Sequence, residues 1–372
     1  MGEVAELARR ARERGRLGID TEFMGEGRYR ALLCLVQVAV DEADGAGGAE
    51  ARVEVLDPLD DGLETRELAA VLADPEIEVV MHAGRQDVAL LRRVWATDVR
   101  NVFDTQVAAG FAGLRAQLGY EALLSEMVGV RLRKSASFTR WDARPLSPEQ
   151  VSYAREDVLH LLALADALQD RLRQLGRLDW AREECRVLEE ASDVREIPAV
   201  FARLPRVNSL DPAQRAVAYE LSEWRERTAR EADRPVQTVL SDAGLVEVAK
   251  RRPRNLERLR QIRGLNEAAL HRRGQAIIAA VERGRERPPI PVEGERPAQP
   301  EPQDAALIAL GEALVRARAL ESKLAYELIA ARADLQRIAL AVRDGAPEPD
   351  VRTLPGWRRE LVGAELIDRL RG

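Results

Sequence analysis

Aromatic residues and cysteines are scarce in this chain of 372 residues. Phe, Trp and Tyr make up 4% of it and only two cysteines occur, whereas 46% of the residues are hydrophobic. The cores must therefore consist mainly of Leu, Val, Ala and Ile. Cys34 and Cys185 have neither a disulfide-framework spacing nor a metal-ligand spacing, so we expect both to be reduced and buried.

Long apolar segments are also missing. No run approaches the roughly 18–20 apolar residues of a membrane-spanning helix, and residues 1–16 are charged and amphipathic, unlike a signal peptide. We therefore expect a soluble, cytoplasmic protein without a membrane partner. The length allows two or three domains, and we expect a monomer.

Positive charge is carried almost entirely by arginine, because the chain has only three lysines. The net charge is −6, but residues 208–285 hold 16 Lys or Arg against 11 Asp or Glu, a local net of +5. The rest of the chain is correspondingly acidic. A basic module attached to an acidic body suits phosphate binding in one part and metal binding in another.

Short apolar runs alternate with helical patterns at the start of the chain, which predicts an α/β domain over residues 1–190. The expected strands are 17–23, 31–40, 52–57 and 77–81, with helices at 65–72 and 87–94. From Ser147 onward all patterns are helical, and helices are predicted to start at Ser147 and at Asp211, each of which is followed by Pro. Six of the 18 prolines fall in residues 286–303, which predicts a linker between helical domains at 207–285 and 304–372.

Two acidic motifs near the N-terminus are candidates for a metal site. Asp20 and Glu22 project from one face of a predicted strand, where neighbouring carboxylates repel each other unless a cation binds. Taken alone, the same pattern fits an edge strand whose polar face is in water. Asp87 follows a turn that contains His82 and begins a helix, where an acid also suits the helix dipole. For His82, a structural role and a substrate-side role are equally open.

A third motif lies on the helix that begins after Ser147. Tyr153 and Asp157 are four residues apart, so they share one face of that helix and could serve one site. A helix flank with Tyr at the core border and Asp in solvent is the structural alternative. Asp104 is followed by Thr and Gln, and we expect it to cap a helix rather than to bind a metal.

The order of these motifs is that of the DEDD exonucleases in their tyrosine-bearing subclass, and the chain resembles the bacterial ribonuclease D family. The blocks that carry the resemblance include residues 20–23 (DTEF), 35–37 (LVQ), 56–59 (LDPL), 82–84 (HAG), 103–106 (FDTQ), 134–135 (KS) and 141–147 (WDARPLS). The similarity covers about residues 17–188. It implies an RNase H-like α/β exonuclease domain with a mixed sheet.

The resemblance also implies roles for residues. Two divalent ions, Mg²⁺ or Mn²⁺, would bind the four carboxylates, and Tyr153 would orient the attacking water. The expected reaction is 3′→5′ hydrolysis of RNA, transfer RNA precursors by family resemblance, to nucleoside 5′-monophosphates. The catalytic residues would be Asp20, Glu22, Asp87, Tyr153 and Asp157. Phe23 and Met24 are placed to stack on bases, and His82 and Lys134 would also contact substrate.

Residues 207–285 resemble the HRDC domain, a helical module of helicases and ribonuclease D, and residues 304–372 resemble a degenerate second copy. Such modules contact phosphates, and Arg251, Arg252 and Arg254 are the best candidates for those contacts. A helical scaffold without RNA contact is the alternative for this domain. For the whole chain, the alternatives are a proofreading-type DNA exonuclease and a non-catalytic nucleic-acid scaffold.

Overall fold

The computed structural model describes residues 2–42, 51–115, 117–132, 140–265, 267–292 and 301–371. These residues form two compact units. The α/β unit comprises residues 2–22, 33–192 and 301–371, and the helical unit comprises residues 23–32 and 193–292. Lys134 lies outside the described residues. No helix in the described ranges is both long enough and apolar enough to cross a membrane.

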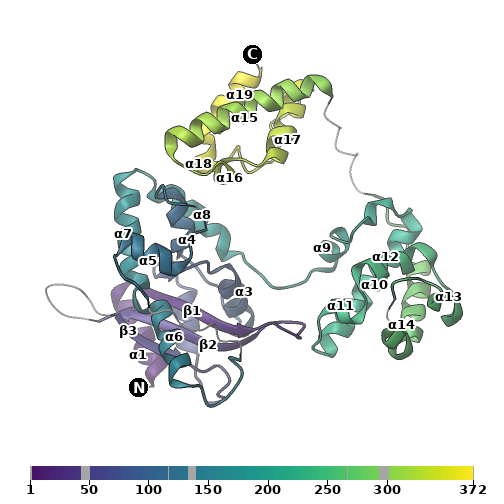
Figure 1. Cartoon of the computed structure of the whole chain (residues 1–372), viewed down its shortest axis with the longest axis horizontal. Coiled ribbons are helices and arrows are strands. Elements are labelled where there is room, and N and C mark those ends of the chain that lie inside the picture. Colours follow the sequence, from purple (N-terminus) through teal and green to yellow (C-terminus); the bar gives the residue numbers. More distant parts are fainter. Residues whose placement is uncertain are drawn as a thin grey trace. The chain divides into compact units, whose positions relative to one another are not determined.

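The α/β unit is built on a five-stranded mixed sheet of order β3-β2-β1-β4-β5, of which Figure 1 labels β1, β2 and β3. The strands are β1 (Arg16–Met24), β2 (Leu32–Asp41), β3 (Ala51–Leu56), β4 (Glu78–Met81) and β5 (Val102–Asp104). β2 and β3 are antiparallel, whereas β4 runs parallel to both β1 and β5. Because parallel strands end at the same edge of a sheet, the carboxyl ends of β1, β4 and β5 share one edge.

The four predicted strands are confirmed, and β5 is an additional one. β2 is buried continuously from Leu33 to Val40, as expected for a strand covered on both faces. β5 was not predicted as a strand because only three residues pair with β4. Its last residue, Asp104, caps the next helix as predicted, since its side chain accepts from the N–H groups of Gln106 and Val107.

Eight helices surround this sheet among the described residues up to position 190. They are α1 (Glu3–Arg14), α2 (Arg66–Leu72), α3 (Arg85–Val94), α4 (Thr105–Phe111), α5 (Tyr120–Met127), α6 (Pro148–Leu159), α7 (Leu161–Gln174) and α8 (Leu178–Glu189). The predicted helix start at Ser147 is confirmed by a complete capping box with Gln150. α6 packs against β3, α7 against β4 and α8 against β5.

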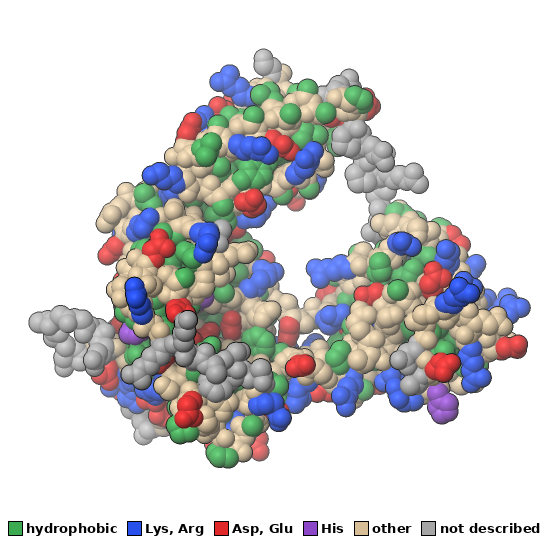
Figure 2. Space-filling model, viewed as in Figure 1, with side chains coloured by type: hydrophobic (Ala, Val, Ile, Leu, Met, Phe, Trp, Pro, Cys, Tyr) green, Lys and Arg blue, Asp and Glu red, His purple; other side chains and the backbone are tan. Residues whose placement is uncertain are grey.

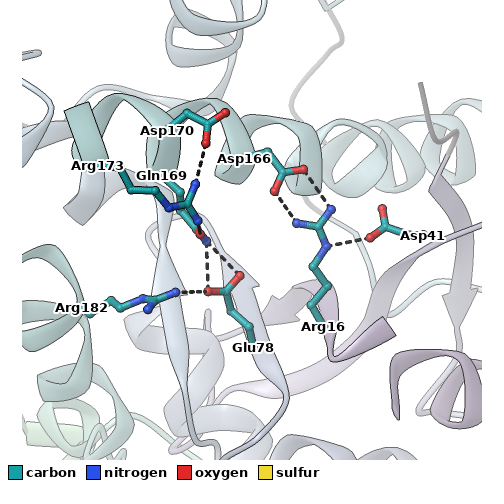
Figure 3. A network of polar contacts seen from close by, with 8 residues as sticks. All are labelled: Arg16, Asp41, Glu78, Asp166, Gln169, Asp170, Arg173 and Arg182. Atoms are coloured by element: carbon teal, nitrogen blue, oxygen red, sulfur yellow. Dashed lines mark hydrogen bonds and ion pairs between the residues drawn. The ribbon is translucent and has the colours of Figure 1, made fainter. Parts of the chain in front are cut away.

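A polar network attaches α7 to the beginning of the central strands (Figure 3). Arg16, the first residue of β1, donates to Asp41 at 2.7 Å and also pairs with Asp166 of α7. Glu78, the first residue of β4, accepts two bonds of 3.0 Å from the Gln169 amide of α7. These contacts fix α7, and with it the preceding α6, relative to the strands. They lie at the opposite end of β1 from Asp20 and Glu22.

The C-terminal segment, residues 301–371, packs against the α/β domain. Its elements are α15 (Pro302–Ser322), α16 (Tyr326–Ile329), α17 (Arg332–Arg343), α18 (Gly356–Arg358), a π-helical turn (Arg359–Gly363) and α19 (Ala364–Arg371). Trp357 is fully buried, 5.0 Å from the Phe111 ring and stacked on Trp180 at 5.6 Å. Arg358 pairs with Glu184 of α8 at 2.8 Å. The aromatic contacts of this segment are therefore part of the α/β core.

The helical unit has its own hydrophobic core. It contains α9 (Ile197–Ala202), a short 3₁₀ turn (Val207–Ser209), α10 (Pro212–Glu231), α11 (Val236–Val239), α12 (Asp242–Arg251), α13 (Leu256–Arg260) and α14 (Glu267–Glu286). α10 packs against α9, α11, α12 and α14, so it is the central helix. The predicted start at Asp211 is confirmed by a capping box with Gln214.

The segment that follows the Asp20–Glu22 motif belongs to this helical unit. The Tyr29 hydroxyl donates to Glu226 at 2.9 Å, and Arg28 pairs with Asp233 at 2.9 Å. Glu226 is buried and also accepts from Arg195 at 2.8 Å. The buried carboxylate is thus compensated by an arginine and a phenol, as a charge in a protein interior requires.

Candidate metal centre and active site

The four predicted acidic residues come from three elements of the α/β unit. Asp20 and Glu22 lie near the end of β1, Asp87 in the first turn of α3, and Asp157 in the last turn of α6. Burial, reinforced by the carboxylates of Asp87, Asp157 and Glu22, holds the pKa of Asp20 well above its usual range. Since charge–charge effects of this kind require proximity, the structure brings the four acids together around Asp20.

The pKa values of the neighbouring acids Glu22 and Asp157 are also raised. Burial, followed by repulsion from Asp157 and Asp87, raises the pKa of Glu22 to about 8. Burial raises the pKa of Asp157 to about 7, with a smaller contribution from Glu156. No basic side chain contributes to the pKa of these groups among the described residues. Their charges are therefore uncompensated by the described part of the protein, in contrast to the Arg-paired Glu226.

Asp87 is held by the residue between the two strand acids. The Thr21 hydroxyl donates to Asp87 Oδ1, and both side chains are buried. This bond occupies a lone pair of one carboxylate oxygen and favours the ionised form, although burial raises the pKa of Asp87 overall. No motif identified Thr21 as a site residue. The alternation of side chains along β1 assigned it to the opposite face from Asp20 and Glu22, and gave no sign that Asp87 reaches it.

The donor set suits a hard divalent cation. Carboxylate oxygens without cysteine ligands favour Mg²⁺ or Mn²⁺ over zinc, and bound cations would neutralise the repulsion that raises the pKa values. Within the described ranges, no three acidic, histidine or cysteine side chains are already arranged to hold one metal ion. The carboxylates are thus neighbours rather than a closed ligand set. The residues fit the metal by type, burial and charge.

Tyr153 lies on the same side as the carboxylates. Burial, followed by the charges of Asp157, Glu22 and Asp20, raises the pKa of Tyr153 to about 12. Its ring lies 6.0 Å from that of Trp141, tilted by 35°. The phenol is therefore protonated at neutral pH. The predicted proximity of Tyr153 and Asp157 on α6 agrees with this electrostatic coupling.

An ion pair anchors the segment that leads into α6. Arg144 donates to both oxygens of Asp57 at 2.6 Å, to the Trp141 carbonyl at 2.8 Å and to the Cys34 carbonyl at 3.0 Å. Bidentate Arg–carboxylate pairs fix geometry as well as charge. The LDPL and WDARPLS blocks are far apart in the sequence, yet they meet here. Their function in the fold is to position α6 and its two site residues.

Asp104 organises the turn before α3. Besides capping α4, its carboxylate accepts from the N–H groups of Ala83 at 3.2 Å and Gly84 at 2.7 Å. Asp104 is only 1% exposed, so these bonds replace its lost hydration. Gly84 is required there, because an added Cβ would lie 2.7 Å from the Cβ of Met81. Asp104 therefore positions the turn that carries Asp87.

His82 lies in this turn and contacts two residues that the sequence analysis did not identify. Its Nδ1 is 2.9 Å from the Thr105 hydroxyl, and its ring is 5.5 Å from that of Tyr120. Burial raises the pKa of Tyr120, and the carboxylates of Asp157 and Asp20 add to the effect. Tyr120 is thus a second phenol close to the acids. No sequence motif distinguished it.

The other predicted substrate residues occupy different parts of the chain. Phe23 and Met24 end β1 and are half-buried. Arg251 ends α12 and Arg254 follows it, and both are exposed, whereas Arg252 is half-buried with a left-handed φ of 44°. Figure 2 shows many Lys and Arg side chains on the visible face of the helical unit. Their contact with substrate stays a prediction.

Comparison with protein families matches two regions of the chain. A family described as "3'-5' exonuclease" matches residues 2–173, and a family described as "HRDC domain" matches residues 214–281. The expected fold class, a mixed-sheet exonuclease domain followed by a helical HRDC domain, is therefore confirmed. The first match contains all five predicted catalytic residues.

Individual relatives match almost the whole chain. The ribonuclease D of Gluconacetobacter diazotrophicus is 35% identical over 98% of this chain and 90% of its own length, and that of Granulibacter bethesdensis is 34% identical over the same shares. Among solved structures, Escherichia coli RNase D, "an exoribonuclease involved in structured RNA processing", has a TM-score of 0.83 and 29% identity over 99% of this chain and 96% of its own. The chain belongs to the ribonuclease D family.

Proposed function

We propose that this chain is a metal-dependent 3′→5′ exoribonuclease that releases nucleoside 5′-monophosphates. The observation that carries the proposal is the set of four neighbouring carboxylates with raised pKa values and no described basic partner. Uncompensated buried acids are costly to maintain, and binding cations is the function that explains their retention. A phenol coupled to the same acids supports hydrolysis rather than metal storage.

Asp20 would be the ligand shared by two ions, since its carboxylate is influenced by all three other acids. Glu22 and Asp157 would complete one ion's ligands, and Asp87 would serve the other. Thr21 already bonds to Asp87 Oδ1, so this acid is oriented by the protein. When bound, the ions would lower the pKa of water and stabilise charge on the attacking and leaving oxygens.

Tyr153 would orient the attacking water. Because its pKa is raised to about 12 by burial and by the nearby acids, the phenol is protonated at neutral pH and has one proton to donate. It would therefore direct the water by hydrogen bonding, rather than act as the base that first removes its proton. General acid–base and positioning effects of this kind contribute about 10²–10⁴-fold to rates.

The substrate would be RNA with a free 3′ end, including structured RNA such as transfer RNA precursors. The helical unit supports this, because residues 208–285 carry a net charge of +5 and expose Arg251 and Arg254. Phosphate contacts of this kind give affinity without sequence selection. Phe23 and Met24 would stack on bases at the 3′ end.

The direct test uses a single-stranded RNA labelled at its 5′ end, a DNA of the same sequence, and an RNA with a base-paired stem and a 3′ extension. Each is incubated with Mg²⁺, Mn²⁺ or EDTA. The proposal expects stepwise shortening of both RNAs with metal and none in EDTA. Hydrolysis of DNA alone would favour the proofreading-type alternative. Binding of RNA without any hydrolysis would favour the scaffold alternative.

A further inference from the structure

The Thr105 hydroxyl determines which nitrogen of His82 carries the proton. Thr105 Oγ1 donates to the Met81 carbonyl at 3.1 Å, which uses its only hydrogen. Its contact of 2.9 Å with His82 Nδ1 must therefore have His82 as the donor, because a threonine hydroxyl has one proton and two lone pairs. In the neutral ring, Nε2 is then the acceptor.

Nε2 is available to a ligand. No other described residue bonds to the His82 ring, and its Nε2 is not among the buried polar atoms that lack a partner. Burial lowers the pKa of His82, and the opposing charge of Asp104 is the smaller effect, so the ring is neutral near pH 7. A neutral acceptor selects ligands that donate a hydrogen bond.

The position of His82 places this acceptor beside the acidic centre. His82 follows β4 at the edge where β1 also ends. Its ring contacts Tyr120, whose own pKa responds to Asp157 and Asp20. His82 and the acids Asp157 and Asp20 therefore both lie close to Tyr120. Tyr120 is half-buried, and its hydroxyl oxygen is buried.

The chemistry of an RNA 3′ end restricts the partner. Phosphate oxygens are ionised at neutral pH and only accept, so they cannot bond to a neutral Nε2. Base amino groups donate, but uracil has none, so they would give a sequence preference. A free 3′-hydroxyl occurs only on the last nucleotide, whereas every ribonucleotide has a 2′-hydroxyl, which can donate and which distinguishes RNA from DNA.

We propose that His82 Nε2 accepts a hydrogen bond from the 2′-hydroxyl of a nucleotide at the 3′ end, and that His82 thereby contributes to the selection of RNA over DNA. This inference rests on the proposed exoribonuclease function. It assigns His82 a specificity role and Thr105 a positioning role. Thr105 fixes the ring tautomer and touches no substrate.

The experiment compares RNA oligomers that differ by one oxygen. One is entirely ribonucleotide, and the others carry a single 2′-deoxynucleotide at the last or the penultimate position. For the wild type, kcat/KM should fall about three- to tenfold for one of the deoxy oligomers, the usual effect of one neutral hydrogen bond. His82→Ala should show that loss on the all-ribose oligomer and no further loss on the deoxy oligomer.

Thr105→Val keeps the side-chain shape but frees the imidazole tautomer, and it should reduce the discrimination partially. His271→Ala is the matched control, because His271 is exposed on α14 of the helical unit; it should discriminate like the wild type. Binding of the same oligomers to Asp20→Asn, measured by fluorescence anisotropy, reports the contact without hydrolysis. The double variant Asp20→Asn/His82→Ala should bind the all-ribose and the deoxy oligomers with the same affinity.

The inference would be overturned if His82→Ala lost the same factor in kcat/KM on the all-ribose and the deoxy oligomers. It would also be overturned if the wild type hydrolysed these oligomers with the same kcat/KM. Melting curves identify a variant that fails to fold. His82→Gln, which retains a side-chain acceptor, then takes the place of His82→Ala. Partial discrimination between the all-ribose and deoxy oligomers by this variant supports the inference. Discrimination equal to that of the wild type, with unchanged rates, contradicts it. A wild type that hydrolyses no RNA would instead refute the proposed function.

Discussion

Glu22→Gln should remove the pH dependence of stability that Glu22 gives the metal-free protein. The pKa of Glu22 is raised from its ordinary value of 4.5 to about 8, first by burial and then by Asp157 and Asp87. The folded chain therefore binds this proton more tightly than the unfolded chain. Ionisation destabilises the fold, so Glu22 costs nothing below pH 4.5 and costs progressively more as the pH rises to about 8.

The magnitude follows from the two pKa values. Each pH unit between 4.5 and 8 costs 1.36 kcal/mol, which gives a limit of about 5 kcal/mol once both states are ionised. Because Glu22 and Asp157 repel each other electrostatically and the pKa of Asp157 is also raised, the two residues share part of this free-energy cost. A change of roughly 2–4 kcal/mol in the free energy of unfolding between pH 5 and pH 9 is therefore the expected range for Glu22.

The assay is urea unfolding in EDTA at five pH values from 5 to 9. Tryptophan fluorescence is suitable because four of the five tryptophans, Trp95, Trp141, Trp180 and Trp357, lie in the α/β unit. The stability of the wild type should fall relative to Glu22→Gln as pH rises. Mn²⁺ should restore the stability of the wild type at pH 8 and should raise the stability of Glu22→Gln less. Parallel pH profiles of the two proteins would refute this account of Glu22.

Four further outcomes are expected. Asp20→Asn should slow RNA hydrolysis by about 10³-fold or more, because a shared metal ligand is lost, while the metal-free melting temperature stays equal or rises. Tyr153→Phe should lower kcat by about 10²–10⁴-fold and leave Mn²⁺ affinity, measured by calorimetry, unchanged; wild-type rates would make Tyr153 a packing residue. Trp357→Ala should destabilise the α/β unit by about 3–5 kcal/mol, because the ring is fully buried; a loss below about 1 kcal/mol in urea unfolding would contradict the docking of the C-terminal segment. Reversing Arg251 and Arg254 to Glu should raise KM for structured RNA and flatten the salt dependence of binding, and an unchanged slope would show that the helical unit does not hold RNA.

The proposed catalytic residues were accessible to sequence reasoning because each lies in a short pattern. The alternation of side chains in β1 placed Asp20 and Glu22 on one face, and helical spacing paired Tyr153 with Asp157. Capping signals predicted the starts of α6 and α10, because a cap depends on a few consecutive residues. Such local rules need no knowledge of the tertiary fold.

The positioning residues were not accessible, because their function depends on contacts between distant segments. The Thr21 hydroxyl donates a hydrogen bond to Asp87. The hydroxyl of Thr105, which follows β5, bonds to Nδ1 of His82, which follows β4. Both threonines lie in the DTEF and FDTQ blocks, but the sequence does not indicate which side chains they contact. The docking of Trp357 against Phe111 was missed for the same reason. The pattern of residues 304–372 indicated helices, but it did not indicate which surface they cover.

The central claim is that the four carboxylates hold divalent metal ions that drive hydrolysis from an RNA 3′ end. Its most direct test follows a single-stranded RNA labelled at the 5′ end, with Mg²⁺, Mn²⁺ or EDTA, using the wild type and Asp20→Asn. The account predicts products that shorten one nucleotide at a time from the 3′ end, only with metal and only in the wild type. Shortening in EDTA, or equal shortening by Asp20→Asn, would contradict it.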